Sequence, residues 1–338
     1  MSTPEFRLPD EFGSGPRRSH RESHQPVPER NVPDKPVAPQ RHSRSITPFM
    51  GGAVPDVDRV GFPLSGRQLD ACVRAALQED GAFEDVPTIA CVLSTRRAHG
   101  MIVARHAGIV AGIPFAVAAF RLLDPNITIR VDVDDGEHVS ANTEIMRISG
   151  LARAILSAER VALNYLQRLS GIATSTSRYV ESLRGTRTMV DGTWRVTPGV
   201  RLIESYAMRA GGARPDDAVC HIREHHVAAM MGDLAYAVQR VRAHAEPDAR
   251  IEVQCRSPGQ VRAALAAGAD AVLLDGMNPA QVRECVEVVA GRAKVNAAGG
   301  IALDTVRSYA HAGADHVSIA GIVQEAGPLE LTLEMETA

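Results

Sequence analysis

Residues 267–277 read AGADAVLLDGM and residues 312–321 read AGADHVSIAG, so the tetrapeptide AGAD twice precedes an aliphatic segment that ends in glycine. Helical patterns lie between the aliphatic segments, as in SPGQVRAALAAGA, NPAQVRECVEVVAG and ALDTVRSYAHAGA. The predicted strands begin near four residues: Ile251, Ala271, Ala293 and His316. Repeated strand–helix units with buried, aliphatic strands are typical of a parallel sheet.

Two earlier segments supply further strands of the same kind. They are TMVDG (188–192) and AVCHI (218–222). Together with the later strands they suit a β/α barrel, in which parallel strands alternate with helices. The chain is therefore expected to have an α/β fold, with a TIM-like barrel domain behind a smaller domain.

The region in front of the barrel mixes helical and strand patterns, which predicts a small α+β domain. Residues 65–81 start with a serine cap, carry apolar residues at helical spacing and end at Gly81. Residues 100–114 alternate and predict two paired strands, and residues 127–150 predict strands around a DDG turn. Residues 153–184 form one long helical pattern.

The ends of the chain differ from these two domains. Residues 1–60 are rich in Pro, Arg, Ser and His and poor in aliphatic residues, which predicts a disordered tail. The chain is therefore divided into that tail, an N-terminal α+β domain over 61–152 and a barrel domain over 153–325. The last segment, 326–338, is expected to pack back on the N-terminal domain.

Composition argues against several classes of protein. The net charge of the 338 residues is −3, so generic nucleic-acid binding is not expected. The chain has no apolar run long enough to span a bilayer and no apolar segment typical of a secretory signal. Its five cysteines are scattered without a C-x-x-C pair, which favours reduced thiols. We expect a cytoplasmic protein that acts on a small molecule.

A histidine-rich stretch raises the question of a metal site. Residues 220–227 read CHIREHHV and contain H-x-x-E-H, a pattern found in inverted zinc peptidases. Such a site needs His221 and His225 one turn apart on a helix, together with a distant acidic ligand. Adventitious metal binding by the histidines is a second reading of the same residues.

The barrel architecture predicts where chemistry takes place. Active sites of β/α barrels lie at the carboxyl ends of the strands, and the last two strands commonly bind phosphate. That rule selects these positions: Gly192–Arg195, Arg223–His226, Gln254, Asp275, Ala298–Gly300 and Ala320–Gly321. Gly299-Gly300 allows backbone N–H groups to approach an anion, although a structural turn explains it equally well. Asp275 suits a metal or ribose hydroxyls, or a helix cap. Arg195 and Arg223 suit a carboxylate or a phosphate.

Four stretches resemble the quinolinate phosphoribosyltransferase family, also called nicotinate-nucleotide pyrophosphorylase, within residues 64–338. They are SAERVALNYLQRLSGIATSTSRYVESLRGT (157–186), TPGVRLIESYAMRAGG (197–212), AGADAVLLDGM (267–277) and AAGGIALDTVRSYAHAGADHVSIAG (297–321). The resemblance implies transfer of a phosphoribosyl group from phosphoribosyl pyrophosphate to quinolinate, with Mg²⁺, and decarboxylation of the product to nicotinate mononucleotide. It also implies an incomplete β/α barrel.

The resemblance assigns roles to individual residues. It implies a homodimer in which Arg160 is donated to the active site of the partner subunit. Catalytic roles fall on Arg195, Arg223, Gln254 and Asp275, and Asp275 is also the implied metal ligand. The implied substrate-binding residues are Arg160, Thr193, Trp194, Arg214, His226, Ala298, Gly299, Gly300, Ser318, Ala320 and Gly321. CHIREHHV becomes a strand that runs into a loop, so His221 and His225 should not share a helical face.

Several of these positions depart from the family pattern. GTWRVTPG (192–199) stands where the family has D-T-R-K-T-T-P-G, so Trp194 and Arg195 replace an arginine and a lysine. A short asparagine-histidine-arginine segment is missing after Gly212, where Arg214 is a partial substitute. The other changes are Arg223 for lysine, Gln254 for glutamate, Asn296–Ala298 for E-A-S and Ala320 for glycine.

Three functions are therefore considered. The first is the family reaction. It would have to proceed without some of the charged residues that contact the quinolinate dianion in the family, and the loss of each such contact costs about 2–5 kcal/mol. The second is a divergent enzyme with a different acceptor or nucleotide, because Trp194 offers a flat apolar wall. The third is a non-catalytic dimer that binds a ligand. The exchange of lysine for arginine and the retained Asp275 favour retained small-molecule chemistry.

Overall fold

The computed structural model describes residues 44–46, 60–193, 195–214 and 219–337. The tail predicted over residues 1–60 lies outside the described residues, apart from Val60 and the strand Arg44–Ile46. Among the helices in the described ranges, none has both the length and the apolar character needed to cross a membrane.

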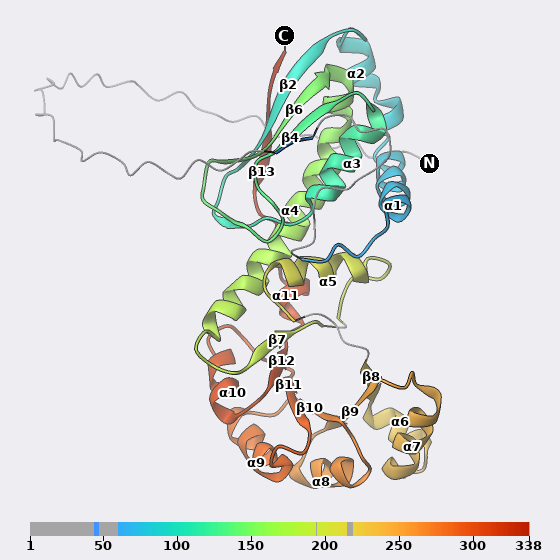
Figure 1. Cartoon of the computed structure of the whole chain (residues 1–338), viewed down its shortest axis with the longest axis vertical. Coiled ribbons are helices and arrows are strands. Elements are labelled where there is room, and N and C mark those ends of the chain that lie inside the picture. Colours follow the sequence, from blue (N-terminus) through green and yellow to red (C-terminus); the bar gives the residue numbers. More distant parts are fainter. Residues whose placement is uncertain (1–43, 47–59, 194, 215–218, 338) are drawn as a thin grey trace, which may run out of the picture. The chain divides into compact units, whose positions relative to one another are not determined.

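The N-terminal part is built on a five-stranded antiparallel sheet with the order β1-β4-β6-β2-β13 (Figure 1). Its strands are β1 (Arg44–Ile46), β2 (Arg97–Ala104), β4 (Thr128–Val131), β6 (Thr143–Leu151) and β13 (Leu331–Thr337). β13 is the last strand of the chain, and its pairing with β2 adds the C-terminal segment to this sheet.

A separate two-stranded ribbon consists of β3 (Gly108–Ile109) and β5 (His138–Val139). Two strands were predicted within residues 100–114, and β2 and β3 lie there. The predicted pairing between them is wrong. β2 pairs with β6 and β13, which occupy both of its edges, so β3 pairs with β5 instead.

Three helices precede the long helix of the chain: α1 (Gly66–Glu79), α2 (Val86–Cys91) and α3 (Ile113–Leu123), with a 3-10 turn at Ala82–Glu84. The predicted serine cap of α1 is confirmed, because Ser65 Oγ accepts the N–H of Gln68 while Gln68 Oε1 accepts the N–H of Ser65. Leu69, Val73 and Leu77 recur every four residues on α1 and are buried. α1 and α4 both contact α3, whose residues 113–120 are all buried.

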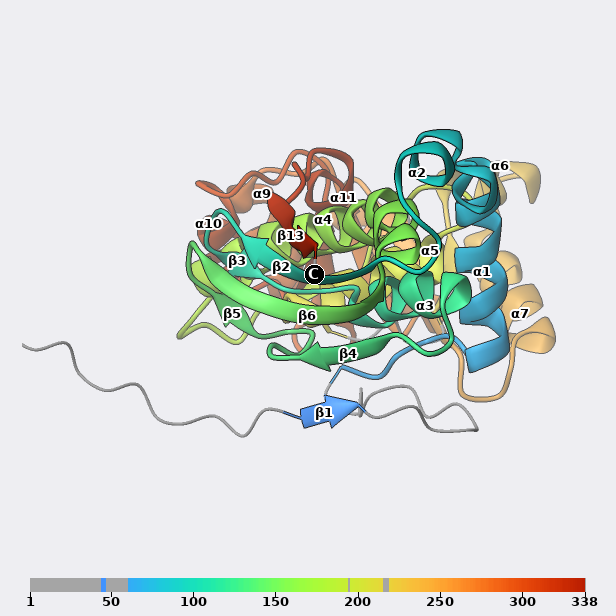
Figure 2. The ribbon, with the colours of Figure 1, turned by 90° about the horizontal axis from the view of Figure 1, so that it is seen from above.

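The helix α4 (Ala152–Ser182) connects the N-terminal sheet with the barrel (Figures 1 and 2). It contacts α3, β2 and β6 of the N-terminal part, and also α5 (Arg201–Ala210), β7 (Met189–Asp191) and α10 (Val306–Ala312). Gly171 lies against the backbone of Gly327, where a Cβ would overlap the Gly327 carbonyl oxygen. Gly171 therefore permits a close contact between α4 and the chain segment that leads into β13.

A buried carboxylate, Asp135, links α3 to α5. Its oxygens accept the N–H groups of Gly112 and Ile113 at the start of α3, at 3.0 and 3.1 Å, and the hydroxyl of Tyr206 on α5. Burial raises the pKa of Asp135 above its ordinary value, although the hydrogen bonds oppose that shift.

The second sheet has six strands in the order β7-β12-β11-β10-β9-β8, and all of its pairings are parallel. The strands are β7 (Met189–Asp191), β8 (Val219–Ile222), β9 (Arg250–Cys255), β10 (Ala271–Asp275), β11 (Lys294–Ala298) and β12 (His316–Ser318). The helices between and after them are α6 (Glu224–Ala229), α7 (Leu234–His244), α8 (Pro258–Ala266), α9 (Pro279–Val289), α10 (Val306–Ala312) and α11 (Gly321–Gln324). Within the described residues no ladder joins β7 to β8. The predicted fold, an incomplete β/α barrel preceded by a small α+β domain, is confirmed.

The two AGAD repeats share one structural role. Asp270 precedes β10, donates its N–H to the carbonyl of Ile251 at 2.9 Å and accepts the Ile251 N–H on Oδ2 at 2.8 Å. Asp315 precedes β12 and makes the same pair of bonds to Val295, both at 2.9 Å. The glycines Gly268 and Gly313 have φ angles of +84° and +101°, which favour glycine. Each repeat thus ends a helix and fixes the start of the neighbouring strand.

Replacing Gly171 with alanine should lower the free energy of unfolding by about 1–3 kcal/mol, because the new Cβ would displace the backbone at Gly327. Urea and thermal unfolding measure this change. The matched control is Gly66→Ala at the start of α1, where a Cβ meets no atom within 4 Å, and its stability should be unchanged or slightly higher. Equal stabilities of Gly171→Ala and the wild type would contradict the close contact.

Candidate functional site

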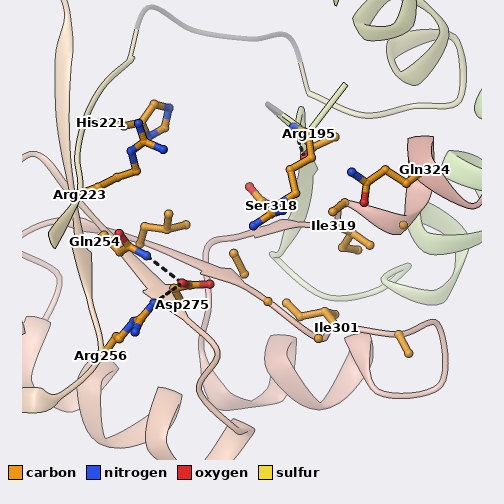
Figure 3. A pocket seen from close by; sticks show the side chains of 18 of the residues that line it. Arg195, His221, Arg223, Gln254, Arg256, Asp275, Ile301, Ser318, Ile319 and Gln324 are labelled. Carbon is orange, nitrogen blue, oxygen red and sulfur yellow. Dashed lines mark hydrogen bonds and ion pairs between the residues drawn. The ribbon is translucent and has the colours of Figure 1, made fainter. Parts of the chain in front are cut away.

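A cavity of about 1080 Å³ lies at the carboxyl ends of the barrel strands (Figure 3). Parallel strands bring residues distant in sequence to this one edge. Eleven residues predicted from the sequence line the cavity: Thr193, Arg195, Arg223, Gln254, Asp275, Ala298, Gly299, Gly300, Ser318, Ala320 and Gly321. Four predicted residues are not in that set: Arg160, Arg214 and His226 lie elsewhere, and Trp194 lies outside the described residues.

Asp275 ends β10, lines this cavity and accepts hydrogen bonds from two neighbouring side chains. Its Oδ2 accepts a hydrogen bond from Gln254 Nε2 at 2.7 Å and one from Arg256 Nη2 at 3.4 Å (Figure 3). The Gln254 amide oxygen in turn lies 3.5 Å from the backbone N of Glu224. The neutral Gln254 therefore connects two strand ends, because its amide can donate to Asp275, which the carboxylate of a glutamate could not do.

Sequence reasoning missed Arg256, which follows β9 directly. Its Nη2 lies 3.4 Å from Asp275 Oδ2, and its Nη1 lies 3.6 Å from Glu224 Oε2. The strand-end rule selected Gln254 in β9 and stopped there, although the next exposed position along the chain belongs to the same rim. The signal was present in the sequence, since a cation that follows a parallel strand lies at the site edge.

Arg195 and Arg223 reach the cavity from two different segments, the first after β7 and the second after β8 (Figure 3). Both residues are exposed, and within the described ranges neither guanidinium makes an ion pair. The Arg223 N–H donates to His226 Nδ1 at 3.2 Å, so His226 caps the start of α6. The convergence of two arginines predicted from the strand-end rule is therefore present, while His226 has a local structural contact.

The stretch CHIREHHV divides between a strand and a helix. His221 belongs to β8, with Nδ1 at 2.8 Å from Glu252 Oε1, and His225 belongs to α6. The prediction that the two histidines do not share a helix is confirmed, but the predicted loop is wrong, because a short helix begins at Glu224. Among the described residues, no group of three or more His, Cys, Asp or Glu side chains is placed to hold a metal ion.

Two glycines follow β11 on the rim of the cavity. Gly299 and Gly300 have φ angles of +84° and +69°. A Cβ at Gly299 would lie 2.8 Å from Asp275 Oδ1 and 2.8 Å from the backbone N of Gly276. Gly299 thus allows the loop after β11 to lie directly beside Asp275, where any larger residue would push the two strand ends apart.

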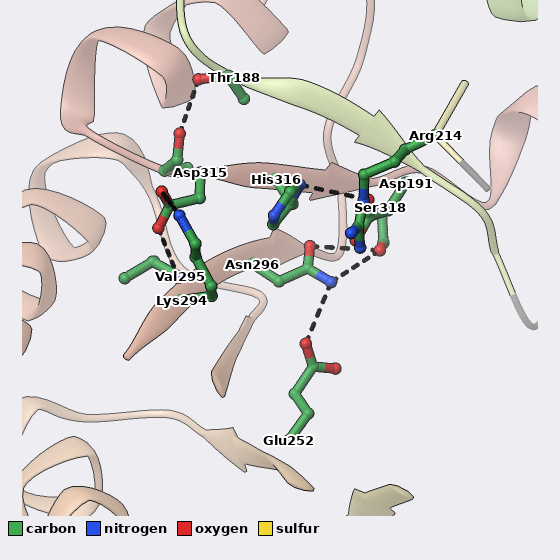
Figure 4. Close-up of polar contacts among 11 residues, drawn as sticks. Thr188, Asp191, Arg214, Glu252, Lys294, Val295, Asn296, Asp315, His316 and Ser318 are labelled. Atoms are coloured by element: carbon green, nitrogen blue, oxygen red, sulfur yellow. Dashed lines mark hydrogen bonds and ion pairs between the residues drawn. The ribbon is translucent and has the colours of Figure 1, made fainter. Parts of the chain in front are cut away.

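The barrel interior beneath this cavity is polar and encloses a smaller space of about 190 Å³. Arg214 Nε and Nη2 donate to the two carboxylate oxygens of Asp191 at 2.7 and 3.2 Å, and His316 Nδ1 lies 3.3 Å from Asp191 Oδ1 (Figure 4). Asn296 Nδ2 donates to Glu252 at 3.3 Å and to Ser318 at 3.0 Å. Arg214 therefore neutralises an interior carboxylate of the same chain.

The residues around Asp191 change the pKa of its carboxyl group. Burial by itself raises the pKa of Asp191, but hydrogen bonds from His316 and Arg214 and the charges of both residues outweigh burial and lower the pKa below the ordinary value. Asp191 is therefore held as a carboxylate, and its stabilising contribution is present above the ordinary aspartate pKa and is lost as the pH falls through the lowered pKa.

Arg160 lies on α4 away from the cavity of its own chain. Its side chain is 69% exposed, and its Nε lies 3.2 Å from Asp80 Oδ2. An exposed ion pair of this kind contributes little to stability. The guanidinium can therefore leave Asp80 at little cost.

The chain is similar to known proteins along most of its length. The quinolinate phosphoribosyl transferase C-terminal domain matches residues 172–334, and the N-terminal domain of the same family matches residues 85–170. A probable carboxylating nicotinate-nucleotide pyrophosphorylase of Methanothermobacter thermautotrophicus is 34% identical over 275 residues, which is 78% of this chain and 97% of the relative. The human carboxylating nicotinate-nucleotide pyrophosphorylase is 33% identical over 273 residues, covering 77% of this chain and 91% of the relative.

The fold is similar to solved structures as well. The crystal structure of NadC from Streptococcus pyogenes has a TM-score of 0.77 and 32% sequence identity, covering 82% of this chain and 100% of that chain. Because both domain families match in order and the relatives are covered over nearly their whole length, the chain belongs to the quinolinate phosphoribosyl transferase family.

Proposed function

We propose that this chain is a phosphoribosyltransferase that joins the ribosyl group of phosphoribosyl pyrophosphate to the ring nitrogen of quinolinate. The observation that carries the proposal is the cavity at the strand ends, which Arg195 and Arg223 line together with Asp275 and a diglycine loop. Family membership supports the reaction class, since the relatives bear the name of carboxylating nicotinate-nucleotide pyrophosphorylase.

The acceptor would be held by the two arginines. Quinolinate carries two carboxylates, and a planar guanidinium binds a carboxylate through two parallel hydrogen bonds. Arg195 and Arg223 have no ion pair among the described residues, so their donors remain available for a ligand. They follow β7 and β8, the two edge strands of the six-stranded sheet, so the two guanidinium groups can bind two separate anionic groups of one ligand.

The phosphates would be held by the loops after β11 and β12. Gly299 and Gly300 place backbone next to the cavity without side chains, and Ala320 and Gly321 line it after the adjacent strand. Backbone N–H groups in such turns bind phosphate oxygens. Ser318 contributes a hydroxyl between the cavity and the polar barrel interior.

The proposed reaction has two steps. The ring nitrogen forms a bond to the ribosyl C1′ while the bond from C1′ to pyrophosphate breaks, and the electron pair leaves with pyrophosphate. The 2-carboxylate of the product then departs as CO₂, and a proton takes its place on the ring carbon. Positive charge develops at C1′ during the first step, and the carboxylate of Asp275 would stabilise it.

The Mg²⁺ implied by the resemblance fits these residues poorly as an ion held by the protein alone. Mg²⁺ is usually held by one or two carboxylates together with substrate phosphates. Asp275 Oδ2 already accepts hydrogen bonds from Gln254 and Arg256, and the guanidinium of Arg256 would repel a dication. We propose that Mg²⁺ enters as the counter-ion of phosphoribosyl pyrophosphate. Direct ligation by Asp275 stays a prediction.

A homodimer in which Arg160 completes the active site of the partner subunit belongs to the same proposal. Arg160 lies outside the cavity of its own chain and is highly exposed, as a residue donated to another subunit must be. We also propose a cytoplasmic enzyme, in keeping with the reduced state of all five cysteines.

A different acceptor is the second candidate. Arg214 was expected to replace a missing substrate contact, but it is bound by Asp191 in the barrel interior. Among the described residues the cavity thus lacks one cation that the sequence predicted for the acceptor, and the cation that it gains, Arg256, lies against Asp275 and Glu224. That observation favours an acceptor with fewer carboxylates than quinolinate.

The reaction itself can be tested by mass spectrometry. Purified protein with phosphoribosyl pyrophosphate, Mg²⁺ and quinolinate should form nicotinate mononucleotide above a control without enzyme. A ribosylated product from another pyridine or benzoic acid, with none from quinolinate, would support the second candidate. The absence of product from every acceptor would contradict catalysis and favour a ligand-binding dimer.

Removing either cavity arginine should impair the reaction strongly. Arg195→Ala and Arg223→Ala should each lower kcat/KM for quinolinate by about 30-fold or more, since an unpaired buried charge costs about 2–5 kcal/mol. Steady-state kinetics measures the loss. Arg262→Ala is the matched control, because Arg262 is exposed on α8 and does not line the cavity. An equal effect of all three variants would contradict the assigned sites.

Mixed dimers test the role of Arg160. Arg160→Ala and Arg223→Ala homodimers should both be inactive, whereas re-association of a mixture should restore about a quarter of wild-type activity, because half of the dimers carry one intact site. Activity assays of the mixture, together with light scattering for the dimer, measure this. A monomer, or a mixture as inactive as its parents, would rule out donation across the interface.

A further inference from the structure

A single guanidinium bridges two carboxylates that line the cavity, those of Glu224 and Asp275. Arg256 Nη2 lies 3.4 Å from Asp275 Oδ2 (Figure 3), and Arg256 Nη1 lies 3.6 Å from Glu224 Oε2. Glu224 starts α6, Arg256 follows β9 and Asp275 ends β10, so the bridge spans three successive strand–helix units. A divalent cation bound between two strand-end carboxylates would occupy the same place.

Other groups of the protein also lie against both oxygens of the Asp275 carboxylate. Gln254 Nε2 donates to the same Oδ2 at 2.7 Å. Oδ1 faces the backbone of Gly299, so closely that a Cβ there would lie 2.8 Å away. A metal ion at Asp275 would therefore have to displace Gln254 or Arg256, or enter between the carboxylate and the glycine loop.

Charge leads to the same conclusion as geometry. Gln254 is neutral and can donate a hydrogen bond to Asp275, which reduces the negative charge available to a cation. Arg256 places a positive charge beside Asp275. This charge would repel a metal dication bound at Asp275. The local environment suits an arginine and disfavours a dication.

Arg256 is also free to change partners. Its side chain is 59% exposed, and both of its ion-pair contacts are long. Exposed ion pairs of this geometry are weak, so a ligand with several negative charges competes for the guanidinium. Arginine binds phosphate oxygens through paired N–H donors.

We infer that Arg256 supplies the positive charge that binds pyrophosphate in this site. Arg256 thereby takes the role that a metal ion bound by the protein would otherwise have. In the absence of a ligand it bridges Asp275 and Glu224, and it turns to the pyrophosphate group when the donor binds. The pyrophosphate part of this inference rests on the proposed function, whereas the exclusion of a metal ion does not.

The first test measures metal binding without any substrate. Titration with Mn²⁺, followed by electron paramagnetic resonance of the free ion, should show that Arg256→Ser binds Mn²⁺ about ten-fold or more tightly than the wild type, because the repelling charge is gone. Arg262→Ser is the matched control and should behave as the wild type. Mn²⁺ binding to the wild type as tight as binding to Arg256→Ser would overturn the inference.

The second test measures inorganic pyrophosphate binding by calorimetry in the presence of a chelator. The wild type should bind pyrophosphate without a metal ion, and Arg256→Ser should bind it about ten- to a hundred-fold more weakly. Arg256→Lys retains the charge and should keep most of the pyrophosphate affinity while still excluding Mn²⁺, which separates the effect of the charge from damage to the fold. Unchanged pyrophosphate affinity in Arg256→Ser would overturn the inference, even if the enzyme is active. Loss of quinolinate turnover alone would not overturn it.

Discussion

The parallel sheet depends on two aspartates that bond to backbone at the start of the strands. Asp270 and Asp315 each hold the first residues of a neighbouring strand through a pair of hydrogen bonds, to Ile251 and to Val295. These bonds fix the register of β9, β10, β11 and β12 at their amino ends. Because the register is fixed there, the opposite ends of the strands reach the same level, and the residues that follow them form one cavity.

The barrel below the cavity is filled with charged and polar groups where many barrels carry aliphatic layers. Arg214 neutralises Asp191 there, His316 Nδ1 lies against the same carboxylate, and Asn296 joins Glu252 to Ser318. A buried charge without a partner is costly, so each member of this network depends on the others. The network also explains why Arg214, which was expected in the active site, does not reach it. Its guanidinium is bound by the carboxylate of Asp191 in the barrel interior.

Sequence patterns predicted the architecture and most of the rim, because both follow from periodicity and from one rule about strand ends. Arg195, Arg223, Gln254 and Asp275 were placed correctly at the cavity for that reason. The pattern could not show the partner of a side chain across the barrel, so Arg214 was assigned to the substrate although Asp191 holds it. Nor could it show that His226 caps the short helix α6, or that the side chain of Arg256 turns back towards Asp275.

The proposed reaction requires that Arg195 and Arg223 hold a dicarboxylate in position for ribosyl transfer and decarboxylation. The decisive measurement is a single-turnover experiment with quinolinate labelled with ¹³C in its 2-carboxyl group, in which labelled CO₂, pyrophosphate and nucleotide are measured together. The three products should form in equal amounts, and Arg223→Ala should abolish them together. Pyrophosphate released without labelled CO₂ would contradict the proposed reaction, because C1′ would then have been transferred to water or to another nucleophile, or the quinolinate nucleotide would have kept its 2-carboxylate.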